Sequence, residues 1–354
     1  MASTQENPVE KLKQDIESAK RDFSSVISNT GLNSVRDDFS ELDTKIANLG
    51  LRIQKLRDRK YAFNKIIEKQ GSEFQKQWAS KKLSIQNQIT TEANNLRNAV
   101  RPLEMRVNSL RVGLTSQGMV DAIKHEIDNF ESRVSSSERM LKDQFDDLQT
   151  EVEKLGTDLS KVESTLDHCD AASFGFLPGE AVVMAVKAVW TRDDKKEDKD
   201  DPEGILFLTD QRLLFEQKEE IATKKVLFVT TERELVQKLQ FEVPVVSVET
   251  VKATKQGLFK NEDWIEMVLA SGSFSREVKL HLDGQDSNEW QKLITRVKTR
   301  EIDADRAIAI DQAAVEKVKA APSQCPNCGG AITAPVLRGQ DTIKCEFCGN
   351  VIRL

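Results

Sequence analysis

The sequence predicts a multidomain α+β protein with a long helical coiled coil, a small β domain capped by a helix, and a C-terminal ribbon built on four cysteines. Three observations lead to this prediction. Apolar residues recur at helical spacing over residues 1–168, short β-rich runs alternate with polar turns over 174–300, and two Cys-x-x-Cys pairs lie within 323–354. The alanine-rich stretch 301–322 between them favours a helical linker.

The overall composition excludes several classes of protein. The 354 residues include 52 basic and 58 acidic side chains, for a net charge of -6, so bulk electrostatics gives no case for strong binding to nucleic acid or to an anionic membrane. We find no apolar run of the roughly 18–20 residues that a membrane span needs, and the N-terminal residues lack the pattern of a secretory signal. Four of the five cysteines form Cys-x-x-Cys pairs, which suits a reducing compartment. We therefore expect a cytoplasmic protein, with peripheral attachment to a membrane left open.

The first 168 residues carry the stripe of a coiled coil. Apolar residues recur at alternating steps of four and three, starting with Val35, Phe39 and Leu42 and reaching Leu166. Breaks near residue 31 and over 113–118 divide this stripe. We predict a leading helix over about 7–29, a long helix over about 34–114 that Pro102 kinks without ending, and a second over about 119–167.

The two main helices of this prediction differ in length. At 1.5 Å per residue, pairing roughly 80 residues with roughly 50 leaves on the order of 45 Å of apolar stripe uncovered within one hairpin. The leading helix could cover part of this length and a second chain the rest, so we predict self-association as a homodimer. The alternative is a monomeric helical bundle.

The middle of the chain changes to the pattern of strands. We predict strands at Ala181–Trp190, Gly204–Asp210 and Arg212–Phe215, and a closing helix from about Ser287 that carries an inward Trp290. Further predicted strands are Lys225–Val229, Leu239–Val243, Val245–Lys252, Trp264–Leu269 and Val278–Leu282. Many short strands followed by one amphipathic helix favour a small barrel or sandwich that the helix plugs.

These residues also carry a family resemblance. The segments Leu177-Pro-Gly-Glu180, Gly204-Ile-Leu-Phe-Leu-Thr-Asp-Gln-Arg-Leu-Leu-Phe215 and Val243-Pro-Val-Val-Ser-Val248 resemble a GRAM or bacterial pleckstrin-homology-like domain. The resemblance covers about residues 174–300 and implies a β-barrel capped by a C-terminal helix. It also implies binding of a lipid headgroup or of a protein.

The charges of the β domain bear on that choice. In pleckstrin-type domains the usual lipid site is a basic cluster after the first strand, but here the segment 192–201 holds four basic and six acidic residues. Lys224, Lys225, Lys252, Lys255 and Lys260 are the other candidates for a basic patch. We therefore favour a protein partner and keep lipid binding as the alternative.

The four cysteines predict a metal site. A Cys-x-x-Cys turn brings two thiolates to one ion, and two such turns complete a tetrahedral shell. Sixteen residues separate Cys328 from Cys345, which matches the spacing of zinc sites, and Gly329 and Gly349 supply the backbone freedom after each pair. We predict one structural zinc ion bound by four ligands: Cys325, Cys328, Cys345 and Cys348.

Other interpretations of the four cysteines are weaker. Redox-active pairs would need a βαβ context that the sequence lacks, whereas iron remains an alternative because four thiolates also bind it. The segments Cys-Pro-Asn-Cys-Gly-Gly and Cys-Glu-Phe-Cys-Gly resemble the generic bacterial or archaeal zinc ribbon, which implies a module that binds protein or nucleic acid.

We identify no catalytic residues in the sequence. Cys169, His168, His125 and His281 have no neighbouring pattern that indicates a nucleophile and its base, and no phosphate-binding glycine motif is present. The sequence therefore predicts a non-enzymatic oligomeric scaffold, in which the coiled coil self-associates and the other modules dock an unidentified protein. The alternative function is a peripheral membrane-binding or membrane-remodelling protein that reads lipid headgroups through the GRAM-like domain.

Overall fold

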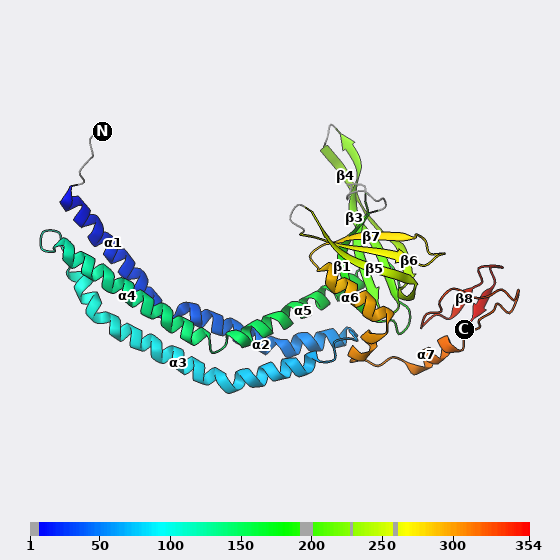
Figure 1. Cartoon of the computed structure of the whole chain (residues 1–354), viewed down its shortest axis with the longest axis horizontal. Coiled ribbons are helices and arrows are strands. Elements are labelled where there is room, and N and C mark those ends of the chain that lie inside the picture. The colour runs from blue at the N-terminus through cyan, green and yellow to red at the C-terminus, as the bar shows by residue number, and fades with distance from the viewer. Residues whose placement is uncertain (1–6, 192–200, 227–228, 258–260) are drawn as a thin grey trace. The chain divides into compact units, whose positions relative to one another are not determined.

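The computed structural model describes residues 7–191, 201–226, 229–257 and 261–354, with the side chains of 221–233 left out (Figure 1). The chain divides into two compact units. One consists of residues 1–50 and 69–157, and the other of residues 51–68 and 158–354. No helix among the described residues has both the length and the apolar character required to cross a membrane.

The N-terminal half is helical. Its helices are α1 (Pro8–Asn29), α2 (Asn33–Asp58), α3 (Ile67–Ser109), α4 (Gln117–Lys142) and α5 (Asp146–Asp170). Local sequence explains where they begin. The side chain of Asn7 accepts a hydrogen bond from the Val9 amide ahead of Pro8, and Ser116 accepts one from the Met119 amide.

The predicted long helix over 34–114 is wrong in one respect, because residues 59–66 interrupt it. Lys60 and Asn64 adopt left-handed conformations there, with φ of 66° and 56°. The Arg57 guanidinium holds the turn by donating hydrogen bonds to three backbone carbonyls, those of Tyr61, Phe63 and Asn64. The predicted helix over about 119–167 is likewise divided in two, because α4 ends at Lys142 and α5 begins at Asp146. Pro102 lies inside α3, as expected.

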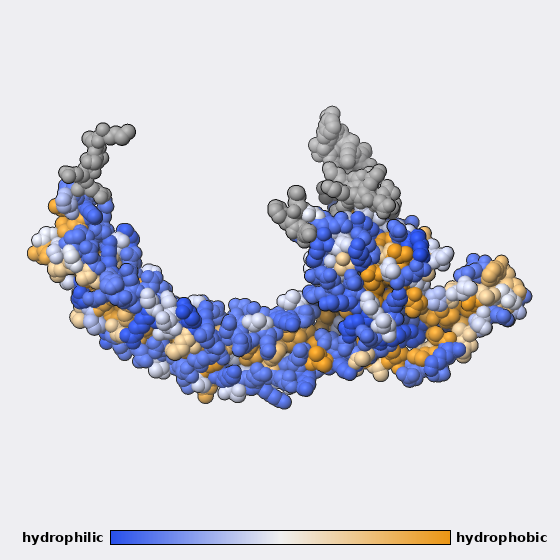
Figure 2. All heavy atoms as spheres, viewed as in Figure 1, coloured by the Kyte–Doolittle hydropathy of each residue, from blue (hydrophilic) through white to orange (hydrophobic). Residues whose placement is uncertain are grey.

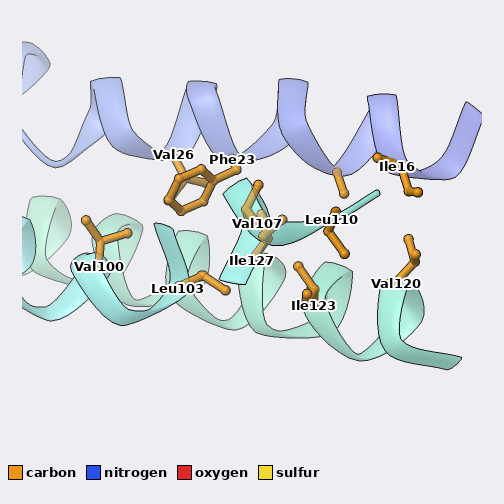
Figure 3. Close-up of a cluster of buried hydrophobic side chains, with 11 residues drawn as sticks. Ile16, Phe23, Val26, Val100, Leu103, Val107, Leu110, Val120, Ile123 and Ile127 are labelled. Carbon is orange, nitrogen blue, oxygen red and sulfur yellow. The ribbon is translucent and has the colours of Figure 1, made fainter. Parts of the chain in front are cut away.

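The first unit has a continuous apolar core. At one end, α1, α3 and α4 contribute side chains that face one another, as Figure 3 shows for Phe23, Val107 and Ile127. Further along, Phe39, Trp78 and Phe145 pack with ring centroids 4.9–6.3 Å apart.

This core removes one argument for a dimer. Residues of the apolar stripe, such as Ile89, Leu96 and Val100, are buried within this one chain. The uncovered length calculated from unequal helices is therefore not present, and the homodimer stays a prediction. Figure 2 shows hydrophilic residues over much of the visible helical surface, with smaller apolar patches between them.

The second unit contains a seven-stranded antiparallel sheet. Its strands are β1 (Val182–Thr191), β2 (Glu203–Thr209), β3 (Arg212–Val226), β4 (Val229–Pro244), β5 (Val248–Gln256), β6 (Glu262–Leu269) and β7 (Glu277–Leu282). They lie in the order β4-β3-β2-β1-β7-β6-β5. The predicted closed barrel is therefore wrong, because β4 and β5 form the two edges and no pairing joins them among the described residues.

The helix α6 (Ser287–Lys298) follows the sheet and begins where the sequence predicts. Asp286 caps it by accepting a hydrogen bond from the Asn288 amide, 2.6 Å away. Trp290, Ile294 and Val297 are buried, which confirms the inward tryptophan. The Trp290 indole satisfies its N–H by donating to Gln285 at 2.7 Å.

Two predicted segments of the β domain differ from the structure or lie partly outside it. The expected strand Lys225–Val229 is instead the end of a long hairpin, in which Val226 of β3 pairs with Val229 of β4. Residues 227–228 lie outside the described residues, as do the charged segment 192–200 and Lys260.

The linker is only partly helical. Arg300 has a φ of 66°, so the chain leaves α6 after Lys298 and forms a 3₁₀ turn, η2 (Glu301–Asp305). A separate helix, α7 (Gln312–Lys319), follows and ends before Pro322. The C-terminal segment then contributes a small hairpin of β8 (Thr342–Lys344) and β9 (Val351–Arg353).

Candidate metal centre

The four predicted cysteines gather at one point in the C-terminal segment. The sulfurs of Cys325, Cys328, Cys345 and Cys348 all lie within 4.8 Å of one another. Among the residues that the structure describes, this is the one group of three or more such side chains placed to share an ion. The structure therefore brings together the set of ligands that the sequence predicts.

Both Cys-x-x-Cys turns have the same backbone geometry. In the first, the Gly329 amide donates to the Cys325 carbonyl at 2.8 Å, and the Cys325 amide donates to Gly330. In the second, the Gly349 amide donates to the Cys345 carbonyl at 2.9 Å, with a matching bond to residue 350. Gly329 and Gly349 have φ values of 73° and 72°, which explains why glycine follows each pair.

The sulfur positions fit a tetrahedral ion. Zinc–sulfur bonds of about 2.3 Å arranged as a tetrahedron place neighbouring sulfurs about 3.8 Å apart. The measured separations are 3.7 Å between Cys325 and Cys348 and 3.6 Å between Cys328 and Cys345. A disulfide would require about 2.05 Å. The sulfur separations therefore suit a tetrahedral ion and are too long for disulfide bonds.

Backbone amides favour the thiolate form at two of these cysteines. The Asn350 amide is the main cause that lowers the pKa of Cys348, to about 6. Burial raises the pKa of Cys325, but the amides of Cys328 and Asn327 outweigh it and lower that pKa overall. The Gly330 amide lowers the pKa of Cys328, but the neighbouring thiols and burial raise it to about 12. Such a cluster of competing thiols is the arrangement that a cation relieves.

The surroundings of the cluster are apolar on one side and open on the other. Cys325 and Cys345 are buried with Ile352, and Ile332 and Ile343 pack against them. Cys328 and Cys348 are exposed. The side-chain amide of Asn327 donates to the Cys348 sulfur at 3.7 Å, a contact that the sequence gave no reason to expect.

Cys169 and the histidines lie apart from this cluster. Cys169 is half-buried and packs in an apolar cluster with Phe174 and Phe176, and burial raises its pKa to about 12. Burial also lowers the pKa of His168. The ring of His281 stacks on Trp264, with centroids 5.0 Å apart. These contacts explain Cys169 and His281 as packing residues.

The loop between the two cysteine pairs is attached to the β domain. The Gln211 side chain accepts a hydrogen bond from the Arg338 amide at 2.5 Å and donates one to the Arg338 carbonyl at 3.1 Å. The Arg338 guanidinium pairs with Asp210, whose side chain is fully buried. Gly339 packs so closely that a Cβ atom there would lie 2.2 Å from the Pro178 carbonyl oxygen. Arg338 is therefore a buried arginine, at 4% exposure.

A second buried ion pair supports the same corner of the sheet. Glu180 accepts two hydrogen bonds from Arg212, at 2.9 Å and 2.6 Å, and others from the Thr209 hydroxyl and the Leu177 amide. Arg212 also pairs with Glu242. The segments Leu177-Pro-Gly-Glu180 and 204–215, which carry the family resemblance, therefore meet at a structural ion pair.

The lysines considered for a lipid site do not form a free basic patch in the described part of the chain. Lys255 pairs with Asp263 and, at 3.5 Å, with Asp286. Lys252 lines a surface pocket of about 670 Å³ in which two more basic residues, Arg276 and Lys279, are mixed with Glu266 and Glu277. The side chains of Lys224 and Lys225 fall outside the described residues.

Comparison with known proteins gives only distant similarities. Neither a protein-family model nor a curated protein matches the sequence. Among solved structures, the Vps36 N-terminal PH domain is 14% identical and matches 36% of this chain and 85% of its own, with a TM-score of 0.25. A pleckstrin homology domain from Shewanella amazonensis is 16% identical over 39% of this chain and 96% of its own, with a TM-score of 0.22.

A longer match extends into the helical half. The DH/PH domains of PDZ-RhoGEF, in complex with activated RhoA, are 10% identical and match 81% of this chain and 94% of their own, with a TM-score of 0.25. PH-like domains thus occur among the structures that this chain resembles.

Proposed function

We propose that this protein is a non-enzymatic scaffold in which a C-terminal zinc ribbon and a PH/GRAM-like β domain dock a protein partner, and the helical region self-associates. The observation that carries the proposal is the four-thiol cluster. Four cysteines fill a tetrahedral shell and leave no position for water or substrate, which is typical of a structural ion. The role of the ion is then to hold a small surface in shape.

The zinc proposal has a direct test. We expect elemental analysis of the purified, reduced full-length chain to find one zinc per chain. A zinc-bound sample should be colourless, whereas a sample that holds iron should be coloured. If the fully reduced chain contains almost no metal of any kind, the proposal is contradicted.

The ribbon offers a surface for a protein partner. Phe347 and Val351 are large apolar residues of the ribbon that remain exposed, at 70% and 60%. We propose that these two side chains anchor the partner, since aromatic residues such as Phe347 are enriched at protein interfaces. In the same segment, the acidic and basic side chains are too mixed to favour nucleic acid.

Affinity capture with the full-length chain tests this role. We expect a protein retained by the wild type to be lost with Phe347→Ser combined with Val351→Ser, while zinc content stays at one per chain. Capture of the same set of proteins by the wild type and the double variant would refute docking through the ribbon.

Self-association, in this proposal, uses exposed apolar side chains rather than the buried stripe. Met105, Val112, Leu114 and Met119 are all exposed and lie around the connection between α3 and α4. Burying them against a second copy would remove apolar area from water. Sedimentation equilibrium of the full chain should therefore show a dimer, and a monomer at all accessible concentrations would remove this part of the proposal.

A further inference from the structure

The β5 edge of the seven-stranded sheet is covered by the helix α6. The Ala253 amide of β5 donates a hydrogen bond to the Gln291 side chain at 2.6 Å. The Lys298 ammonium donates one to the Glu249 carbonyl at 2.9 Å. Side chains of α6 thus satisfy backbone groups of β5 that have no neighbouring strand, and this edge is not open to another chain.

The opposite edge of the sheet, formed by β4, is open (Figure 1). In the part of the chain that the structure describes, β3 is the only strand paired with β4. Beyond that ladder, no hydrogen bond from another described residue reaches the backbone of 234–243. Such an edge presents a row of N–H and C=O groups on which a further strand can pair.

The regular part of the β4 edge is short. Residues 234–239 pair with β3 without a register shift, and a bulge at Gln240 ends this run. Beyond the bulge, the ring of Phe241 stacks on Phe274 of the β6–β7 turn, with centroids 4.7 Å apart. At about 3.4 Å per residue, the run over 234–239 is roughly 20 Å long.

The side chains of this run differ between its two faces. Glu234, Val236 and Lys238 share one face. Glu234 and Lys238 are exposed, and neither has an ion-pair partner among the described residues. On the other face, Leu235 is 58% exposed, whereas Leu239 packs against an apolar cluster of β1, β2 and β3. A strand added to this edge would therefore meet one carboxylate, one ammonium group and one exposed leucine.

We propose that the β4 edge binds an extended segment of a protein partner, which joins the sheet as an antiparallel strand. The segment places a basic residue opposite Glu234, an acidic residue opposite Lys238 and an apolar residue opposite Leu235. Because the two strands run in opposite directions, the acidic residue of the partner precedes its basic residue by four positions. Lys238 disfavours any strand that lacks this acid, so the charges add selectivity to the pairing of the backbones.

The length of the edge favours a short segment over a second copy of this chain. A stable interface between two folded chains buries about 1,200–2,000 Å² in total, which is more than a run of roughly 20 Å supplies. A peptide that adds a strand gains affinity from main-chain hydrogen bonds along such a run. The inference rests on the proposed docking role of the β domain, and it names the surface and the kind of segment that binds there.

Fluorescence anisotropy of a labelled synthetic peptide, Thr-Glu-Leu-Thr-Val-Lys-Thr with blocked ends, tests the proposal when the full-length chain is titrated into it at low salt. We expect saturable binding at one site per chain. The peptide Thr-Lys-Leu-Thr-Val-Glu-Thr, which has the same composition, should bind about tenfold more weakly, because two cross-strand pairs then become like-charged. The double variant Glu234→Lys with Lys238→Glu should reverse this preference.

Two N-methylated forms of the first peptide test backbone pairing without any change to the protein. One form carries methyl groups on alternate amides, and the other carries them on the amides between. Successive N–H groups of a strand point to opposite sides, so only one form loses the donors that face β4. That form should lose binding, and the other should keep it. Equal binding of both forms would exclude pairing of the backbones.

No saturable binding of the first peptide at millimolar concentration, or equal affinity of the two charge arrangements for the wild type, would overturn the proposal. Sedimentation velocity separates the remaining occupant, a second copy, because Glu234→Lys alone places like charges opposite one another in a pair of β4 edges. We expect the same sedimentation as in the wild type, and a loss of self-association would assign the edge to a second copy instead. Affinity capture through Phe347 and Val351 is unaffected by these results, so failure of the peptide to bind is distinguishable from failure of the scaffold function.

Discussion

The buried pair of Glu180 and Arg212 allows a quantitative test of how the β domain is held together. The Glu180 side chain is fully buried and accepts two hydrogen bonds from Arg212, one from Thr209 and one from the Leu177 amide. The substitution Glu180→Gln keeps the shape but removes the negative charge. It also replaces one of the two carboxylate oxygens, which accept hydrogen bonds from Arg212, Thr209 and Leu177, with an NH₂ group that cannot accept them.

The structure sets the size of the expected effect. Each donor left without a partner costs about 1–3 kcal/mol, and removing one partner of a buried ion pair costs about 3–5 kcal/mol in all. We expect a loss of this order in the free energy of unfolding of the β domain. For a domain of this length, that corresponds to a lowering of Tm on the order of 10 °C or more.

Urea unfolding followed by tryptophan fluorescence measures the effect, because Trp190, Trp264 and Trp290 all lie in the β domain. The matched control is Glu242→Gln, which removes the other partner of Arg212 at a side chain that is 50% exposed. It should cost less than about 1 kcal/mol. If the two variants lose the same stability, or Glu180→Gln loses less than about 1 kcal/mol, the pair does not hold this corner as argued.

Three more results are expected. Cys345→Ser should lose the bound metal and the folded ribbon but keep the helical circular dichroism of the chain. The control Cys169→Ser should keep the metal, and elemental analysis of the two variants measures the difference. Burial raises the pKa of Cys169 to about 12, whereas in urea its pKa returns to about 8.5. At pH 8 this thiol should therefore react with Ellman's reagent far more slowly in the folded chain than in urea. A rapid reaction of the folded chain that Cys169→Ser abolishes would contradict this expectation. Leu114→Asp, at a side chain that is 84% exposed, should shift the proposed dimer towards monomer in sedimentation. The control Leu83→Asp, at a side chain that is 69% exposed in the middle of α3, should leave the dimer unchanged. Equal effects of the two substitutions would argue against the α3–α4 connection as the interface.

Much of the fold could be predicted because it follows from local patterns. The apolar stripe that starts at Val35 identifies the buried face of the helices, and the caps at Asn7 and Ser116 explain two of their starts. The interruption at 59–66 could not be predicted in the same way. Arg57 and two left-handed residues make a turn there while the apolar stripe continues, so periodicity alone does not reveal it.

The open sheet shows a similar limit. Alternation of apolar and polar residues predicts individual strands, but closure depends on whether the first and last edges meet. In this chain β4 and β5 are the edges, and their distance from one another is a property of the whole sheet.

The cysteines show what the sequence by itself determined. Two Cys-x-x-Cys turns, each followed by glycine, bring their own sulfurs together through local backbone geometry, so residue spacing was enough to predict the ligands. Arg338 shows what only the tertiary structure decided. Its partners Asp210 and Gln211 lie 128 and 127 residues away along the chain, and nothing in its local sequence distinguishes it from an exposed arginine. The convergence of the four sulfurs is a short-range property and could be predicted, whereas burial of a charge is long-range and required the fold.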